Sequence, residues 1–199
     1  MNRLHHQLQP LVLASASPRR VQLLEQIGVE FTQSPANIDE AVLANETAQD
    51  YVTRLAREKS FIIALERPGQ HVLGSDTTVY CGTKILGKPT DLDDYMTMMA
   101  LLSGSTHQVI TAVCIAQLGA SGLTFKEQCV RSDVSFVTLS EAQKLAYWET
   151  GEPIGKAGGY AIQGIGGQFV SQINGSYSAI VGLPLQQTVM CLQQSGVIK

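Results

Sequence analysis

The order of apolar segments along this chain of 199 residues constrains its fold more than any other feature. Short apolar runs, typical of buried strands, alternate with stretches whose apolar residues recur at helical spacing. In the first part of the chain we predict a strand at 11–14, a helix at 18–28, a strand at 29–33 and a helix at 47–65. Alternation of this kind is typical of an α/β protein.

The middle of the chain is richer in strands. Residues 71–74 start an apolar strand that leads out into Asp76 and the residues up to Tyr80, and two longer strand-like segments follow at 107–118 and 124–139. The Gly-Ala-Ser-Gly sequence between these two segments predicts a hairpin. Because a hairpin is added to strand–helix units, we predict a mixed, twisted sheet with flanking helices.

The remaining helices are predicted from their end signals. Asp91 opens one helix, Ser140 and Gln143 form a capping box for the next, and 184–194 form the last. Residues 155–182 are dominated by glycine and other small residues. We expect two domain ranges, with 1–9 as a loose polar extension and 10–199 as a single domain of two lobes around a cleft.

Charge, hydropathy and cysteine content exclude several classes of protein. A net charge of −3 argues against a nucleic-acid coat, which needs a strongly basic face. No apolar run approaches the ~20 residues of a membrane span, and the apolar run at 11–16 is too short for a signal peptide. The cysteines form no C-x-x-C pair, so we interpret them as small buried hydrophobes of a reduced, cytoplasmic protein: Cys81, Cys114, Cys129 and Cys191.

The segment Ser15–Arg20 carries the strongest functional signal. Ser17 is a good N-cap and Pro18 fits the first helical position, which places Arg19 and Arg20 in the first helical turn. Cations there oppose the helix dipole, so a helix selected for stability would have Asp or Glu instead. Hydroxyls, backbone N–H groups and guanidinium groups together suit a polyphosphate. A solvated basic turn is the alternative.

Two acidic positions are candidates for catalysis or metal binding. Asp76 follows an apolar run, and functional groups gather where the strands of open α/β sheets end. A buried carboxylate needs a metal, a cation or water as its partner; the alternative is an Asp that caps a turn. Asp39 and Glu40 lie in an acidic loop, where they would bind a hard cation or face water.

Two lysines are weaker candidates. Residues 82–88 match the start of a phosphate-binding P-loop, but Pro89 stands where Ser or Thr should hold magnesium, so we reject that motif. Lys88 remains of interest as a cation beside a proline. Lys59 lies near the apolar boundary of the helix at 47–65, where snorkelling to solvent is the default interpretation.

Gln163 is a candidate for recognising a base. The glycines after it do not complete a dinucleotide fingerprint, because Phe169 stands at the last glycine position. Glycines in this segment instead permit tight turns and close approach of the backbone. Gln163 offers both a donor and an acceptor, which suits the edge of a base. A solvated loop residue is the alternative.

Several of these segments together resemble the Maf family. The resemblance runs from about residue 10 to the end of the chain, and its motifs occur in the family's order. They are Ser15–Arg20 (SASPRR), 56–59 (AREK), 74–77 (GSDT), 87–89 (GKP), 103–107 (SGSTH), 156–164 (KAGGYAIQG), 173–177 (INGSY) and 181–184 (VGLP).

The resemblance implies an activity and a fold. Maf proteins are nucleoside triphosphate pyrophosphatases whose α/β fold resembles that of the inosine triphosphatase group. Arg19, Thr77 and Gln163 match the subgroup that acts on dTTP and UTP. A divalent cation, Mg²⁺ or Mn²⁺, is implied as cofactor, and nucleoside triphosphates as the ligands.

The resemblance also implies a role for each candidate residue. Asp76 would be the catalytic base or hold the metal, and Glu40 would be a metal ligand. Phosphates would be bound by Ser15, Ser17, Arg19, Arg20, Lys59 and Lys88. A non-catalytic nucleotide-binding regulator of septum formation is the alternative function; it would not need the two carboxylates. A hydrolase of damaged purine triphosphates is disfavoured by Arg19 and Gln163, and a homodimer is left open.

Overall fold

The computed structural model describes residues 4–199, which form two compact units. The first unit comprises the described part of Met1–Asp76, together with Thr111–Val130 and Gly182–Lys199; the second comprises Thr77–Ile110 and Arg131–Val181. Two units agree with the two lobes that we predicted, while the cleft stays a prediction.

Seven strands form one mixed sheet in the order β2-β1-β3-β5-β6-β7, with β4 paired to β3. β1 is parallel to β2 and β3, whereas β4 and β7 are antiparallel to their partners, so the predicted mixed α/β fold is confirmed. The strands are β1 (Leu11–Leu13), β2 (Thr32–Gln33), β3 (His71–Cys81), β4 (Lys84–Leu86), β5 (Thr106–Gly119), β6 (Gly122–Phe136) and β7 (Val170–Asn174).

The helices flank this sheet, and most of them begin where their end signals predict. Thr47 and Asp91 each accept a hydrogen bond from the backbone three residues on, and the capping box of Ser140 and Gln143 is complete. The helices are α1 (Pro18–Gln26), α2 (Ala48–Glu66), α3 (Leu92–Leu102), α4 (Glu141–Glu149), α5 (Tyr177–Val181) and α6 (Leu185–Gln194), with the 3-10 turns η1 (Ala157–Gly159) and η2 (Ile165–Phe169).

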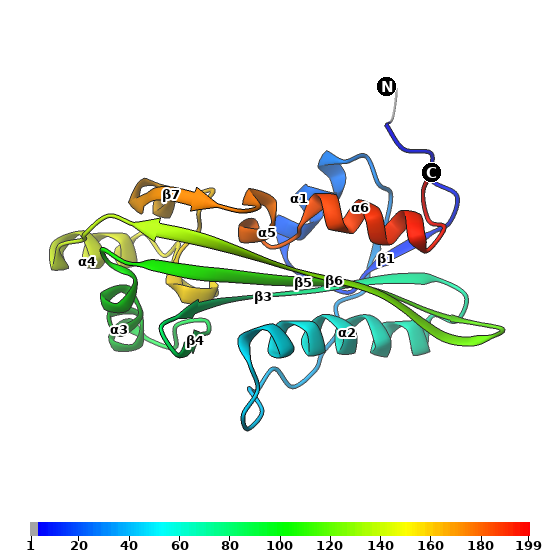
Figure 1. Cartoon of the computed structure of the whole chain (residues 1–199), viewed down its shortest axis with the longest axis horizontal. Coiled ribbons are helices and arrows are strands. Elements are labelled where there is room, and N and C mark those ends of the chain that lie inside the picture. Colours follow the sequence, from blue (N-terminus) through cyan, green and yellow to red (C-terminus); the bar gives the residue numbers. More distant parts are fainter. Residues whose placement is uncertain (1–3) are drawn as a thin grey trace. The chain divides into compact units, whose positions relative to one another are not determined.

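In the first unit, α2 packs along the start of β3 (Figure 1). Val72 of β3 pairs with Val12 of β1, and both are buried with Ile63 of α2 in one apolar cluster. Gly74 permits this packing, because a Cβ there would lie 2.1 Å from the carbonyl oxygen of Ala56. The helix can therefore approach β3 closely at the residue just before Ser75 and Asp76.

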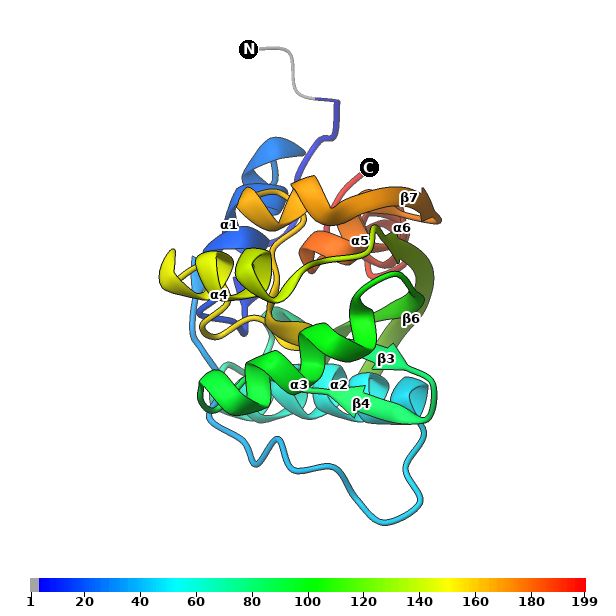
Figure 2. The ribbon, with the colours of Figure 1, turned by 90° about the vertical axis from the view of Figure 1, so that its left-hand side faces the viewer.

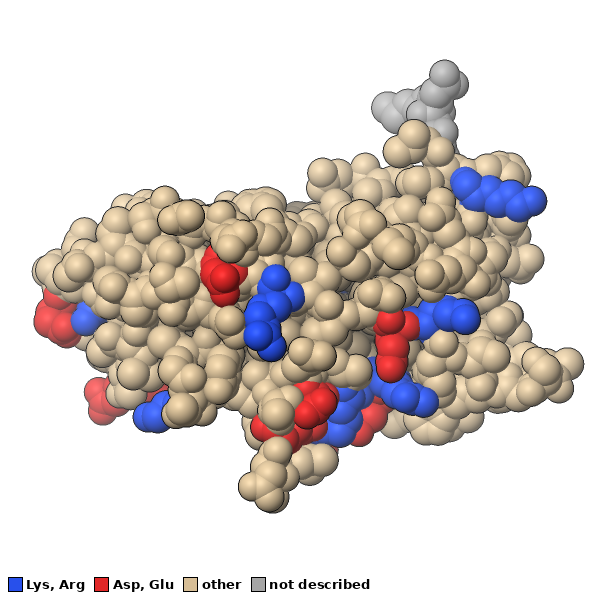
Figure 3. Space-filling model, viewed as in Figure 1, with Lys and Arg blue, Asp and Glu red and all other residues tan. Residues whose placement is uncertain are grey.

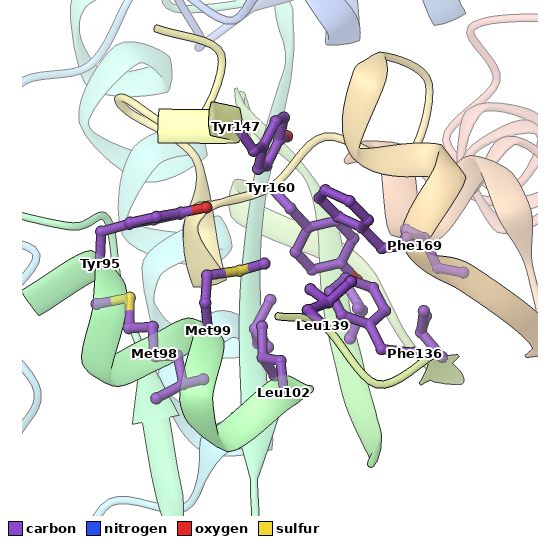
Figure 4. Packing of buried hydrophobic residues seen from close by; sticks show 14 residues of the cluster. Tyr95, Met98, Met99, Leu102, Phe136, Leu139, Tyr147, Tyr160 and Phe169 are labelled. Carbon is purple, nitrogen blue, oxygen red and sulfur yellow. The ribbon is translucent and has the colours of Figure 1, made fainter. Parts of the chain in front are cut away.

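The second unit has an aromatic core between α3, α4 and the strand ends (Figure 4). Tyr95 of α3 is fully buried and donates a hydrogen bond to the Lys144 carbonyl oxygen of α4 at 3.0 Å. The rings of Phe136 and Tyr160 meet edge to face, with centroids 4.8 Å apart. The Met98 and Met99 pair packs in this core, so these methionines serve packing.

Part of the predicted N-terminal extension is held in place. His6 and Lys199 exchange two backbone hydrogen bonds of 3.0 Å, and Gln7 forms an antiparallel bridge with Ile198. These bonds hold residues 6–9, which we expected to be loose, beside the C-terminal end. Residues 1–3 of the extension lie outside the described residues.

Our interpretation of the cysteines is confirmed for two of the four. Cys114 and Cys191 are fully buried, whereas Cys81 and Cys129 are partly exposed because they lie where β3 and β6 are only half covered. All four are free thiols.

Candidate functional site

The centre of the site is an ammonium group that bridges two carboxylates. Lys59 Nζ lies 2.7 Å from Asp76 Oδ1 and 2.6 Å from Glu40 Oε1. The side chains of Lys59 and Asp76 are only 8% and 10% exposed, while that of Glu40 is 41% exposed. Three segments thus supply one charge cluster: α2, β3 and the loop before α2.

Two expectations about these residues are corrected. Lys59 does not snorkel to solvent; its ammonium is buried because two carboxylates attract it. Asp76 does not lie where its strand ends, since β3 continues to Cys81. The parallel pairing of β3 with β1 does end earlier, at Leu73, so Asp76 lies beyond the end of β1.

The electrostatics of Asp76 are set by burial and by two cations. Removal from water raises the pKa of Asp76, and the charges of Lys59 and Arg20 oppose this increase. Burial lowers the pKa of Arg20, whereas Asp76 raises it. Arg20 and Asp76 are therefore close enough for each charge to act on the other.

The Ser15–Arg20 segment forms a turn held by its own side chains. Ser15 Oγ accepts hydrogen bonds from the Ser17 backbone at 3.2 Å and from Arg20 Nη1 at 3.0 Å. Arg20 Nε donates to the carbonyl oxygen of Gly182 at 3.0 Å, and Ser75 Oγ donates to the same oxygen at 3.2 Å. Gly182 thus joins this turn to the strand that carries Asp76.

Within this turn the predicted binding residues differ in their hydrogen bonds and burial. Ser17 stands at the N-cap and Pro18 at the first helical position, as predicted, but the Ser17 side chain makes no capping hydrogen bond. Arg19 follows in the first helical turn, and partial burial lowers its pKa. The basic turn is not simply solvated, because Arg20 is hydrogen-bonded to Ser15 within the turn and to Gly182 in another segment.

Glu40 lies between β2 and α2. Figure 2 shows the chain before α2 as an irregular loop. Helix α2 holds this loop through Tyr51 and Arg54, which donate to the carbonyl oxygens of Glu40 and Ala41 at 2.9 and 3.0 Å. Neither residue was predicted from the sequence. Their only sequence signal is a position one to two turns after the Thr47 cap, which brings them back beside the loop.

The other predicted site residues belong to the second unit. Thr77 follows Asp76 directly in β3, and Lys88 is exposed in the segment after β4. The carbonyl oxygen of Gly87 accepts a hydrogen bond of 2.9 Å from the backbone of Gly158, so the glycine-rich segment lies against the residue that precedes Lys88.

Gln163 is exposed on a loop that Glu152 holds. The Glu152 carboxylate accepts backbone hydrogen bonds from Ile165 and Gly166, both at 2.9 Å, and one from the Tyr147 hydroxyl at 2.7 Å. These bonds lower the pKa of Glu152, although its partial burial opposes them. Glu152 was not predicted from the sequence, in which it is one acidic residue after a helix.

Asp76 and Glu40 suit a divalent cation. Mg²⁺ is usually held by one or two carboxylates together with phosphates and water, not by a protein cage. Two carboxylate oxygens meet here within 2.7 Å of one cationic nitrogen, so they lie close enough to share a cation. Among residues 4–199 no group of three or more His, Cys, Asp or Glu forms such a cage.

Fold and site together define an α/β protein whose first unit gathers two carboxylates and at least two basic side chains in one place. The chain belongs to the Maf family: the profile described as "Maf-like protein" matches residues 10–195. Proteins called "dTTP/UTP pyrophosphatase" match over most of their length. The one from Colwellia psychrerythraea is 48% identical over 195 residues, covering 96% of this chain and 90% of the relative.

Two further relatives have the same name. The "dTTP/UTP pyrophosphatase" of Hahella chejuensis is 48% identical, covering 94% of this chain and 92% of the relative; that of Pseudoalteromonas atlantica is 50% identical, covering 92% and 96%. Among solved structures, the Staphylococcus aureus Ham1 protein aligns with a TM-score of 0.43 at 13% identity, over 68% of this chain and 89% of that one.

Two further features are the distribution of charged side chains on the surface and the length and hydropathy of the helices. On the face shown in Figure 3, basic and acidic side chains are interspersed among uncharged residues. None of the helices formed by residues 4–199 combines the length and the hydropathy that a membrane span requires.

Proposed function

We propose that this protein is a nucleoside triphosphate pyrophosphatase that hydrolyses dTTP and UTP to the monophosphate and pyrophosphate. The names of relatives that are 48–50% identical over nearly the whole chain support this substrate class. The observation that carries the proposal is the cluster of Lys59, Asp76 and Glu40, because hydrolysis of a phosphoanhydride needs both carboxylates and positive charge. A regulator that only binds nucleotides would not need the buried Asp76.

Asp76 and Glu40 would hold the divalent cation, Mg²⁺ or Mn²⁺. When bound, this cation supplies positive charge at the phosphates and activates water. A water oxygen attacks the α-phosphorus, the bond from that phosphorus to the bridging oxygen breaks, and pyrophosphate leaves. Asp76 would act as the base that takes the proton of the attacking water, or would hold the cation that activates this water.

The basic residues would bind the triphosphate. Lys59 neutralises phosphate oxygens next to the carboxylates, and Arg19 and Arg20 bind phosphates at the start of α1. Ser15 and Ser17 assist, since the hydrogen bond from Arg20 to Ser15 Oγ fixes the guanidinium in this turn. Lys88 is the phosphate-binding residue of the second unit.

Base selection would depend on Arg19, Thr77 and Gln163. Uracil and thymine present two carbonyl acceptors that flank an N–H donor. The Gln163 side chain offers a donor and an acceptor to this edge. The hydrogen bonds of Glu152 support this role, since they fix the backbone that follows Gln163.

A substrate panel tests the proposal. Purified protein is incubated with dTTP, UTP, CTP, ATP and GTP in Mg²⁺ or Mn²⁺, and monophosphate, pyrophosphate and orthophosphate are measured. We expect monophosphate and pyrophosphate in equal amounts from dTTP and UTP. Release of orthophosphate alone, or nucleotide binding without turnover, would overturn the proposal; the second result would favour the regulator.

Chemistry suggests the compartment as well. The four free thiols support a cytoplasmic protein, because such thiols persist where the environment is reducing.

Light scattering of the purified protein tests whether it forms a homodimer.

A further inference from the structure

The loop that carries Glu40 has to be fixed by contacts outside itself. It connects β2 to α2 without regular secondary structure, and Val42 and Leu43 within it are 49% and 55% exposed. Ordering each loop residue costs backbone conformational entropy. Without compensating bonds the Glu40 carboxylate would sample many positions, and a ligand that moves binds a cation weakly.

Arg54 of α2 makes several such bonds. Its Nε and Nη2 donate to the two carboxylate oxygens of Glu46 at 2.6 and 2.9 Å, a bidentate pair. The same Nη2 donates to the Ala41 carbonyl oxygen at 3.0 Å, and Nη1 reaches Glu58 at 3.3 Å. One guanidinium therefore joins the residue next to Glu40, the end of the loop and the helix.

Glu46, which Arg54 holds, in turn binds the backbone of the loop. Its Oε2 accepts the backbone N–H of Leu43 at 3.0 Å, and its side chain is only 7% exposed. The hydrogen bond from Arg54 lowers the pKa of Glu46, so the carboxylate stays charged and the pair persists. Arg54 and Glu46 thus hold the loop on both sides of Val42.

The position of Arg54 on α2 links the loop to the charge cluster. Arg54 lies on the same helix as Lys59, whose ammonium contacts Glu40. A rigid helix therefore sets where the Glu40 backbone lies and where its charge partner lies. Capping of α2 alone does not explain these contacts, because Thr47 caps the helix and the Ala41 and Leu43 bonds lie outside it.

We propose that Arg54, acting through Glu46, is a positioning residue that holds Glu40 where it binds the divalent cation. This inference rests on the proposed function and names residues that support its metal ligand. Residues that orient a metal ligand without touching the metal typically change metal affinity by about 10- to 100-fold when they are replaced.

The first experiment measures the metal and the loop separately. Arg54→Met keeps the aliphatic stem and removes the guanidinium; Arg57→Met is the matched control, since Arg57 lies on the same helix over the Phe125 ring at 4.1 Å. Calorimetry with Mn²⁺ alone should give a dissociation constant about tenfold higher for Arg54→Met and unchanged for Arg57→Met. Hydrogen exchange at Ala41 and Leu43 should become faster only in Arg54→Met.

A double-mutant cycle separates positioning from general damage. In a Glu40→Gln background, Arg54→Met should change Mn²⁺ affinity less than twofold, because the ligand that it positions is gone. An equal loss in both backgrounds, or no loss in either, would overturn the inference. Should Arg54→Met fail to fold, Glu46→Gln replaces it in the same cycle.

The outcomes also distinguish this inference from the proposed function. A wild-type protein that binds Mn²⁺ but cleaves no triphosphate would refute the proposed function. The double-mutant cycle could still be measured, because it uses Mn²⁺ affinity and not turnover. A wild-type protein that binds no Mn²⁺ would overturn the inference itself, whatever the exchange rates are.

Discussion

The ammonium of Lys59 and the carboxylate of Asp76 lie 2.7 Å apart and are buried together, although the two residues are 17 positions apart in the sequence. A second carboxylate, Glu40, lies 2.6 Å from the same nitrogen. One ammonium therefore contacts two carboxylates, that of the buried Asp76 and that of the more exposed Glu40. Loss of one partner from such a buried pair leaves an uncompensated charge, which is far more costly than loss of a surface ion pair.

Lys59→Met is expected to destabilise the protein by about 3 kcal/mol in metal-free buffer. The variant retains the aliphatic stem of Lys59 but leaves Asp76 and Glu40 without their shared cation. Urea denaturation with chelator present measures the loss. Adding Mn²⁺ should restore more stability to this variant than to the wild type, because a cation then binds between unpaired carboxylates.

Lys59→Met/Asp76→Asn is the control for this prediction. The double variant carries no uncompensated buried carboxylate, so it should recover most of the stability lost by Lys59→Met. Equal loss in the single and double variants would mean that the charge cluster contributes no specific pairing energy.

Gly74→Ala should disturb the charge cluster by moving α2 away from β3. The added Cβ would lie 2.1 Å from the Ala56 carbonyl oxygen and 2.8 Å from the Ser60 nitrogen, so α2 must move away from β3. Since Lys59 lies on that helix, we expect turnover to fall at least tenfold and stability by about 1–3 kcal/mol. Gly119→Ala is the control, because a Cβ there meets no atom within 4 Å.

Local signals in the sequence predicted much of this fold. Thr47 and the Ser140–Gln143 pair begin helices where the side chains satisfy unpaired backbone N–H groups, which depends on a few adjacent residues. The hairpin of β5 and β6 follows from glycines between two long apolar segments. β7 was missed, since most of its residues are exposed and its pairing with β6 is a long-range contact.

The candidate site was predicted only in part, because it too depends on long-range contacts. The sequence marks Asp76, Glu40 and Lys59 as candidates, but their convergence depends on how closely α2 packs on β3 at Gly74. The default interpretation of Lys59 as an exposed residue was wrong because no local pattern shows which carboxylates it meets. Arg54 was missed because its partners lie in a loop whose path only the folded chain defines.

His107 should make stability depend on pH. Burial lowers its pKa to about 4 from 6.5, and its Nε2 is hydrogen-bonded to the Tyr160 hydroxyl at 2.8 Å. The unfolded chain protonates His107 near pH 6.5 but the folded chain only near pH 4, so stability falls as pH drops through that window. The loss amounts to about 3 kcal/mol at pH 4.

Chemical denaturation from pH 7.5 to 4 of wild type and His107→Gln measures this contribution. The variant should lose less stability than the wild type over this range, whereas His6→Gln, at an exposed position, should follow the wild type. A wild-type curve that is parallel to that of His107→Gln would show that His107 does not titrate as burial requires.

The base preference should depend on Gln163. A cytosine edge places an amino donor where uracil and thymine place a carbonyl acceptor, so a polar group at the site stays unpaired. Such mismatches cost about 1–3 kcal/mol, or roughly 10- to 100-fold in kcat/KM. We expect dTTP and UTP to be cleaved faster than CTP, and all three faster than ATP and GTP.

Gln163→Ala should reduce the preference for dTTP over CTP to less than threefold while kcat for dTTP falls little, since in the proposed function this side chain would contact the base and not the phosphates. Gln168→Ala is the matched control: Gln168 is also exposed, lies five positions further along the same loop, and its amide donates to the Ile165 carbonyl oxygen at 3.1 Å. The ratio of kcat/KM for dTTP, CTP and GTP in each variant is the measurement. Equal turnover of the three nucleotides by the wild type would mean that Gln163 recognises no base, and the assignment to the dTTP and UTP subgroup would have to be withdrawn.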